Sequence, residues 1–359
     1  MAKKGSITDK LLILILIVLI VLLANKFLLH KTTSAETNQT KEVQKNILTE
    51  ADIKGREVFV EAIHHKGCEQ CFPTENVFGY LTSKGLNLTI DERYYEDSDK
   101  DKELIKELGV TKLPVVLLSG NIDGLETVKS LSQFKKKGKY LVLEAPQPPF
   151  YYLPDKKIIG YVNVTYLKDP ECKLCPKIGQ LLVDMQWKMG VGFTQKKAVY
   201  PNMTEFKELV EKYDIKKVPT FIFTGDLLEY ENIKKYWDKV GTIEPDGALV
   251  LRLVNPPYTN PQTGEIEGLV DVTFLAREED KESLAKQAES IRSKYRIVYG
   301  KSQTIALDSE EGKELAEKYG LNKSAVIFSK EAQLYNGLMT EINDTGLKIM
   351  PDGKVVLSE

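Results

Sequence analysis

Two short stretches, Cys68-Glu69-Gln70-Cys71 and Cys172-Lys173-Leu174-Cys175, contain all four cysteines of this 359-residue chain. Each follows an apolar, strand-like run and precedes a helix-like run. Each pair is also matched by a later proline at the start of another apolar run, Pro114 for the first pair and Pro219 for the second. The first cysteine and the proline are 46 positions apart in one case and 47 in the other. Two motifs that recur at nearly the same spacing are far more specific than a lone C-x-x-C pair.

This arrangement resembles the thioredoxin fold, in which a C-x-x-C pair caps the first helix and a cis-proline loop faces it. The resemblance covers nearly everything after residue 50. It implies an α/β fold with a mixed sheet flanked by helices, and a solvent-accessible cysteine pair. Cys175-Pro176 resembles the C-x-x-C-P of archaeal protein disulfide oxidoreductases, and the tandem layout is similar to that of protein disulfide isomerase.

The sequence also repeats. Three segments align at offsets of 105 and 106 residues, about one small α/β domain each: Glu103–Pro114, Glu208–Pro219 and Glu314–Ala325. We therefore predict three tandem thioredoxin-like domains at residues 51–145, 155–254 and 265–359. Proline-rich joints between them are expected to be stiff spacers. These joints contain Pro146, Pro148, Pro149 and Pro154, then Pro256, Pro257 and Pro261.

Local patterns agree with such domains. Apolar residues spaced i, i+3, i+4 and i+7 predict a helix with one buried stripe after the second cysteine pair: Ile178, Leu181, Leu182 and Met185. The third copy has Glu278-Glu279 near the cysteine positions and Ala325 in place of the proline. We expect that domain to be redox-silent, either a spacer or binding surface, as in the silent domains of disulfide isomerases, or a structural remnant.

The bulk composition is that of an ordinary globular protein, with 42% hydrophobic and 28% charged residues. A formal net charge of −2 and the lack of a basic face with interleaved aromatics argue against nucleic-acid binding.

The N-terminus has a different character. Leu11–Ala24 is an unbroken apolar run, and an anchor over residues 11–29 would rise ~28 Å, close to a bilayer core. We predict a transmembrane signal anchor there, a cytoplasmic N-terminus at 1–10 and a polar stalk at 30–50. The alternative is a cleaved signal peptide, with Thr33-Ser34-Ala35 as a poor cleavage site. Lysines before the run place the domains in an extracytoplasmic space.

Six sequons agree with export, since chance would give one or two: Asn38, Asn87, Asn163, Asn202, Asn322 and Asn343. The predicted protein is therefore a single-pass membrane glycoprotein.

The cysteines carry the predicted chemistry. At a helix N-terminus, backbone N–H groups and the helix dipole stabilise a thiolate, which favours attack by the first cysteine of each pair, Cys68 and Cys172. The second cysteines, Cys71 and Cys175, then resolve the mixed disulfide. The resemblance assigns substrate binding to the two proline loops, which are Leu113-Pro114 and Val218-Pro219.

Charged neighbours are candidates for tuning the thiols. Lys173 beside Cys172 favours a thiolate, whereas Glu69 beside Cys68 disfavours one. His64 and His65 precede the first pair and offset Glu69 if protonated. Glu61 is a candidate for the buried acid that the family has near its active site, with a surface residue as the alternative.

Three other interpretations remain open. Both pairs can be inert structural disulfides, or the thiols can bind zinc, either across the two pairs or with His64 and His65 beside the first. Adjacent histidines on a strand point to opposite faces, however, which disfavours the second zinc arrangement. The chain can also be an anchored scaffold that uses such domains without turnover.

The sequence best supports a membrane-anchored, extracytoplasmic thiol–disulfide oxidoreductase without cofactor or metal. Its expected partners are cysteine-containing client proteins, with a separate membrane redox partner as a further hypothesis.

Overall fold

The computed structural model describes residues 48–358, which form two compact units. The first unit takes residues 48–66 and 73–144, and the second takes 67–72 and 145–358. The first cysteine pair is thus grouped with the second unit.

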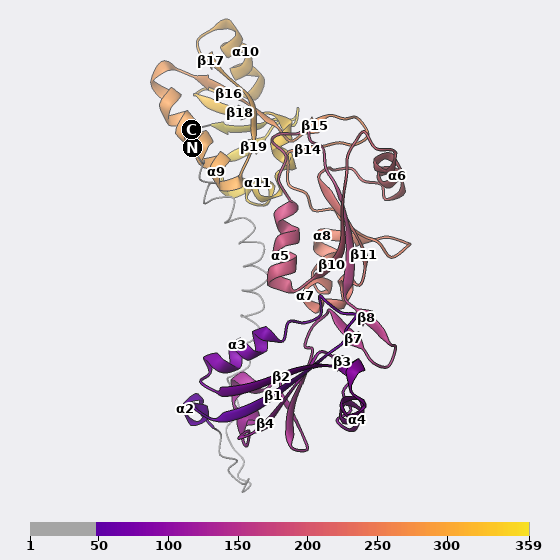
Figure 1. The fold of residues 1–359 in the computed structure, drawn as a ribbon. Coiled ribbons are helices and arrows are strands. Elements are labelled where there is room, and N and C mark those ends of the chain that lie inside the picture. Colours follow the sequence, from indigo (N-terminus) through magenta and orange to yellow (C-terminus); the bar gives the residue numbers. More distant parts are fainter. Residues whose placement is uncertain (1–47, 359) are drawn as a thin grey trace, which may run out of the picture. The chain divides into compact units, whose positions relative to one another are not determined.

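The first unit is a five-stranded mixed sheet in the order β2-β1-β4-β6-β5, flanked by helices (Figure 1). The parallel pair β1–β2 joins Val60 to Ile90, and the other pairs are antiparallel. Its elements are α2 (Glu50–Ile53), β1 (Glu57–His64), α3 (Glu75–Ser83), β2 (Asn87–Tyr94), α4 (Asp99–Glu107), β3 (Lys112–Leu113), β4 (Val115–Gly120), β5 (Lys135–Lys137) and β6 (Tyr140–Glu144).

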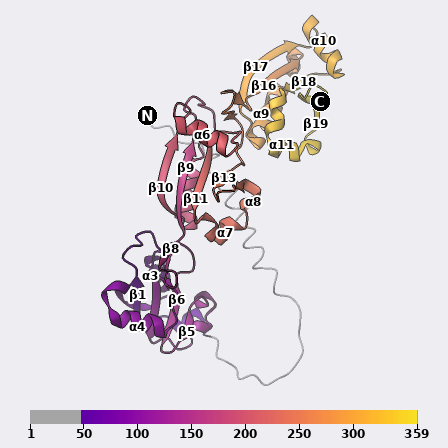
Figure 2. The ribbon, with the colours of Figure 1, turned by 90° about the vertical axis from the view of Figure 1, so that its right-hand side faces the viewer.

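The second unit contains a sheet in the order β10-β9-β11-β13-β12, so that β9 lies between β10 and β11 (Figure 2). The β9–β10 pair is parallel and the remaining pairs are antiparallel. The elements are β9 (Tyr161–Leu167), α5 (Gly179–Met189), β10 (Gly192–Val199), α6 (Thr204–Lys212), β11 (Thr220–Gly225), α7 (Glu231–Lys234), α8 (Trp237–Val240), β12 (Gly241–Ile243) and β13 (Leu249–Leu251).

A third sheet, also in the second unit, has the order β17-β16-β18-β20-β19 and repeats the same arrangement. Its elements are β16 (Val270–Ala276), α9 (Lys281–Tyr295), β17 (Tyr299–Ala306), α10 (Glu310–Tyr319), β18 (Ala325–Phe328), α11 (Asn336–Thr340), β19 (Leu347–Ile349) and β20 (Val355–Ser358). The predicted class, a mixed sheet flanked by helices, is confirmed. Each sheet lies within one predicted repeat, whereas the boundaries of three separate domains remain a prediction.

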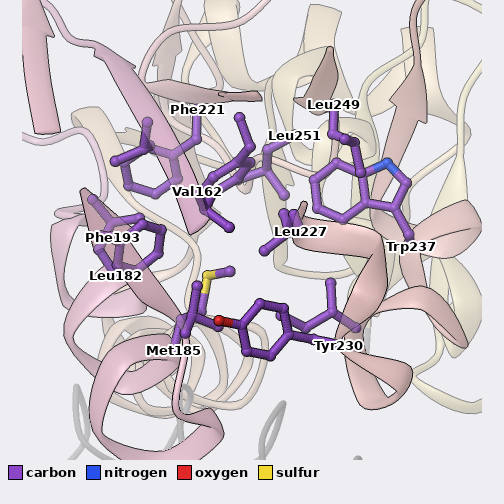
Figure 3. Packing of buried hydrophobic residues seen from close by; sticks show 14 residues of the cluster. Val162, Leu182, Met185, Phe193, Phe221, Leu227, Tyr230, Trp237, Leu249 and Leu251 are labelled. Atoms are coloured by element: carbon purple, nitrogen blue, oxygen red, sulfur yellow. The ribbon is translucent and has the colours of Figure 1, made fainter. Parts of the chain in front are cut away.

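The second sheet has a hydrophobic core on each of its two faces. In β11, Phe221 and Phe223 face the cluster formed with α5, α7 and α8, whereas Ile222 faces the cluster formed with α6. Figure 3 shows the first cluster, in which Trp237 and Tyr230 pack beside the strand residues. Because successive side chains point to opposite faces, each strand supplies both cores.

The helix predicted after the second cysteine pair forms as α5. Leu182 and Met185 are buried, and Ile178 and Leu181 pack against the same cluster. The helix ends at Gly190, whose φ of +69° is the left-handed conformation that glycine adopts readily. The predicted buried stripe is therefore confirmed.

The proline-rich joints contain hairpins, a feature that the sequence did not predict, and their role as stiff spacers between domains stays a prediction. β7 (Phe150–Tyr152) pairs with β8 (Lys157–Ile159), and β14 (Tyr258–Thr259) pairs with β15 (Ile266–Glu267). Gly268 follows the second hairpin at a φ of +87°, where a Cβ would lie 2.3 Å from Cβ of Pro256. A proline composition predicts stiffness, but it does not reveal that the chain turns back.

A buried tyrosine anchors the chain after each hairpin. The Tyr230 hydroxyl donates to the carbonyl of Gly160 at 2.7 Å and accepts the N–H of Gly192 at 2.9 Å. Tyr335 does the same at the third sheet, donating to Gly268 at 2.8 Å and accepting from Val298 at 2.8 Å. Burial raises the pKa of Tyr230 to about 12, which keeps this donor protonated.

The predicted membrane localisation is corrected by this structure. Across residues 48–358, no helix combines the length and the apolar character needed to cross a membrane. The run at 11–29 that motivated the prediction, with the stalk up to residue 47, lies outside the described residues.

Candidate active site

The second cysteine pair forms a disulfide within a turn. Cys172 and Cys175 have Cα atoms 5.4 Å apart, and the N–H of Cys175 donates to the carbonyl of Cys172 at 3.3 Å. The turn precedes α5, which begins only at Gly179. The sequence predicted the pair at the helix start. Pro176 explains the offset, because a residue before proline is disfavoured in the helical conformation.

The predicted proline loop lies beside this disulfide. Sγ of Cys175 is 3.9 Å from the carbonyl oxygen of Val218, and the Val218–Pro219 peptide bond is cis. Thr220 starts β11 directly after the proline, and its buried hydroxyl donates to the carbonyl of Leu251 at 2.5 Å. The fold thus brings together two motifs that are 43 positions apart.

The first pair repeats this turn. Cys68 and Cys71 form a disulfide with Cα atoms 5.3 Å apart, and the N–H of Cys71 donates to the carbonyl of Cys68 at 3.3 Å. The helix α3 again starts late, at Glu75, because Pro73 follows the turn. The predicted partner loop, Leu113-Pro114, contains a cis peptide bond and belongs to the first unit.

The resemblance implies a solvent-accessible cysteine pair, but the cysteines are only partly exposed in the structure. Cys68 is 8% exposed and Cys172 is 7% exposed, so both proposed attacking cysteines are largely buried residues. Cys71 and Cys175 are half-buried. Between the second pair of cysteines, Leu174 is 55% exposed.

The candidate tuning residues have partners of their own. Nζ of Lys173 donates to the carbonyl of Pro170 at 2.7 Å. Nε2 of His64 lies 3.4 Å from a carboxylate oxygen of Glu92, and His65 contacts Glu96 through Nδ1. Lys173, His64 and His65 thus contact a backbone carbonyl and two carboxylates, and none of these three partners is a cysteine sulfur.

Glu61 belongs to an ion-pair network and is only half-buried. Arg93 lies 3.0 Å from its carboxylate and 3.2 Å from that of the buried Asp101. Burial opposes the charge of Arg93, but these carboxylates outweigh it and raise the pKa of its guanidinium.

The sequence did not point to three residues that the structure places at the cysteine turns. The Tyr161 hydroxyl is 3.6 Å from Sγ of Cys68, and the backbone of Thr259 pairs with that of Val218. Asp169 accepts the Thr259 hydroxyl at 2.8 Å. These contacts join segments that are far apart in the sequence, so no local sequence pattern predicts them.

The third sheet has a polar bridge at the equivalent loop. The Ser324 hydroxyl donates to Asp280 at 2.6 Å and accepts the N–H of Arg277 at 3.1 Å. Ser324 precedes Ala325 on β18, where the other repeats have their proline. A hydrogen-bonded bridge thus occupies the region where the redox pairs lie in the other copies.

The cysteines are engaged in disulfides and cannot ligate a metal in this state. Within residues 48–358, no three His, Cys, Asp or Glu side chains gather in an arrangement that could hold a metal ion.

Comparison with known proteins identifies no family. No family model matches the sequence, and no curated protein matches it. Similar solved structures include the alkylhydroperoxide reductase component AhpF of Enterococcus faecalis, at 12% identity, covering 49% of this chain and 86% of that chain, with a TM-score of 0.17.

ERdj5 form II is 8% identical, covers 82% of this chain and 42% of its own chain, and has a TM-score of 0.14. Human ERp44 form II is 9% identical, covers 87% of this chain and 89% of its own chain, and has a TM-score of 0.14. All three are thioredoxin-fold proteins.

Proposed function

We propose that the chain is a thiol–disulfide oxidoreductase whose two C-x-x-C pairs exchange disulfides with cysteine-containing client proteins. The supporting observation is the approach of Cys175 to the Val218 carbonyl, which places a disulfide next to the backbone of a cis-proline loop. Each pair forms its disulfide across one turn, so each can store and release two electrons.

The exchange proceeds in two balanced steps. The thiolate of Cys172 attacks a client disulfide, a mixed disulfide forms, and the client's second sulfur leaves as a thiolate. The thiolate of Cys175 then attacks Sγ of Cys172, which releases the client's first sulfur. The client gains two electrons and two protons, and the Cys172–Cys175 disulfide is restored. The reverse sequence oxidises a dithiol client.

Cys68 and Cys71 have the corresponding roles at the first pair, with Leu113-Pro114 and Val218-Pro219 as client-binding loops. The helix offset changes one part of this account. Because α3 and α5 begin after the cysteine turns, the first N–H groups of each helix do not belong to the cysteines. Thiolate stabilisation must come from other donors near each sulfur.

A structural role for both disulfides is the second candidate. The low exposure of Cys68 and Cys172 favours it, since inert disulfides are shielded from thiols. The two functions differ in reduction potential, because structural disulfides typically lie below about −300 mV and catalytic ones between about −120 and −270 mV.

The test is a redox titration of the full chain. Protein poised in glutathione and dithiothreitol buffers is alkylated, its modified cysteines are counted by mass spectrometry, and zinc is measured on the same sample. We expect two two-electron couples within the catalytic range. Disulfides that stay intact beyond about −300 mV would assign them a structural role. Stoichiometric zinc that protects the reduced thiols would instead support a metal site.

A further inference from the structure

A segment of the chain itself occupies the backbone edge beside the second disulfide. The N–H of Val218 donates to the carbonyl of Thr259 at 2.9 Å, and the N–H of Thr259 donates to the carbonyl of Val218 at 2.8 Å. This is an antiparallel bridge, the pairing that one strand makes with another. We call Tyr258–Thr259, the strand β14 (Figure 1), the strap.

The side chains of the strap tie it to the cysteine turn. The Thr259 hydroxyl donates to Oδ2 of Asp169 at 2.8 Å. Oδ1 of the same carboxylate accepts the N–H of Glu171, directly before Cys172, at 2.9 Å. Tyr258 and Thr259 are both buried. One carboxylate therefore links the strap to the backbone that positions the disulfide.

The strap and an incoming peptide would compete for the same atoms. The Val218 carbonyl accepts the Thr259 N–H and also lies 3.9 Å from Sγ of Cys175. Val218 has one N–H, and Thr259 already takes it. A second strand cannot pair with Val218 at this edge until the strap leaves.

The strap belongs to a short hairpin. Its hairpin pairs through only two residue pairs, Tyr258 with Glu267 and Thr259 with Ile266. Its hydrogen bonds to the site are two from the backbone and one from a side chain, and Nζ of Lys217 lies 4.6 Å from the centre of the Tyr258 ring. Such a short, isolated hairpin has little stability of its own.

We propose that the strap is an internal stand-in for the client strand, and that exchange at Cys172–Cys175 requires its displacement. The inference rests on the proposed oxidoreductase function. Its client class is an extended peptide segment that carries a cysteine and offers a backbone N–H and C=O to Val218. The client's sulfur then forms a mixed disulfide with Cys172, and the sulfur that it was bonded to leaves as a thiolate.

The first cysteine turn has a related contact. The N–H of Phe72, directly after Cys71, donates to the carbonyl of Pro149 at 2.9 Å. Pro149 begins the segment that continues into β7, and the order Pro-Pro-aromatic is shared by both hairpins. A linker that turns back to a cysteine turn is thus a repeated feature.

Weakening the strap tests the proposal. Thr259→Val removes the hydrogen bond to Asp169 but keeps the side-chain volume. We expect the reduction of Cys172–Cys175 by an extended peptide that carries two cysteine thiols, and leaves as the peptide disulfide, to accelerate about tenfold, the effect of one hydrogen bond to a charged group. Reduction by dithiothreitol, which needs no backbone edge, should change less than about twofold.

Thr263→Val is the matched control. Thr263 lies in the turn of the same hairpin, where its hydroxyl accepts the N–H of Glu265, away from Val218. The control should leave both rates unchanged. Equal acceleration by peptide and by dithiothreitol in the Thr259→Val variant, or no acceleration, would overturn the strap proposal.

A trapped complex separates this proposal from the proposed function. In full-length Cys175→Ala protein, a disulfide-bonded peptide should remain joined to Cys172, and hydrogen exchange should show the Thr259 amide losing protection. A mixed disulfide with the Thr259 amide still protected would overturn only the strap. Failure of any mixed disulfide to form would overturn the proposed function, and the strap proposal with it.

Discussion

The hydroxyl of Tyr161 lies 3.6 Å from Sγ of Cys68, so the first residue of β9 contacts the first cysteine of the first pair. Burial raises the pKa of Tyr161, which keeps its hydroxyl protonated at neutral pH. A protonated hydroxyl at this position can donate to the thiolate that forms when the disulfide is reduced. This is a stabilising donor for Cys68 that does not depend on a helix N-terminus.

Tyr161→Phe should therefore raise the pKa of the Cys68 thiol. A hydrogen bond to a charged group is lost, so alkylation of Cys68 by iodoacetamide at pH 7 should slow roughly tenfold. Peptide mapping after timed alkylation of the reduced protein measures the rate. Cys172 in the same molecule is the internal control, and an unchanged ratio of the two rates would contradict this role.

The two tryptophans of the chain form a matched pair for stability. Trp237 is 5% exposed and packs edge-on against Phe223, whereas Trp187 is 81% exposed on α5. Trp237→Ala should lower the free energy of unfolding of the second unit by about 3–5 kcal/mol, because it empties a packed site. Trp187→Ala should change it by less than about 0.5 kcal/mol.

Urea unfolding followed by circular dichroism measures both variants. A large loss from Trp187→Ala would show that its exposed ring has a structural contact, contrary to this account.

Glu144 should make an acid-sensitive contribution to the free energy of unfolding of the first unit. Burial opposes its charge, but the N–H and hydroxyl of Thr111, each at 2.9 Å, and the N–H of Lys112 at 3.2 Å outweigh it. The pKa of Glu144 is thereby lowered from its ordinary 4.5. Because the folded state binds this proton less tightly, the stabilisation is present above pH 4.5 and is lost as pH falls through the lowered pKa.

Glu144→Gln should accordingly flatten the fall in unfolding free energy between about pH 5 and pH 3. Denaturant unfolding at several pH values gives the slope. Glu57→Gln, at an exposed position on β1, is the control and should keep the wild-type slope. Identical slopes for Glu144→Gln and the wild type would contradict the assignment.

Periodic features of the fold could be predicted from the sequence. The stripe that includes Leu182 and Met185 forms the buried face of α5, because helical spacing alone selects that face. The helix start could not be placed as well. Pro176 disfavours helical backbone at Cys175, and the cysteine turn precedes the helix.

The contacts around the two disulfides could not be predicted from the sequence, for a different reason. Thr259 pairs with Val218, and Tyr161 contacts Cys68, across long separations in the chain. Such pairings depend on how a linker turns back after its sheet is complete. Pro256 and Gly268 allow that turn, but neither residue predicts which strand the linker will pair with.

Exchange through Cys172 is tested most directly by trapping. Reduced full-length protein with Cys175→Ala is mixed with a disulfide-linked cysteine peptide, and with Cys172→Ala protein in parallel, and the adducts are mapped by mass spectrometry. The account predicts a stable mixed disulfide at Cys172 in the first variant and little or none at Cys175 in the second. Absence of an adduct at Cys172, or equal adducts at both cysteines, would contradict it.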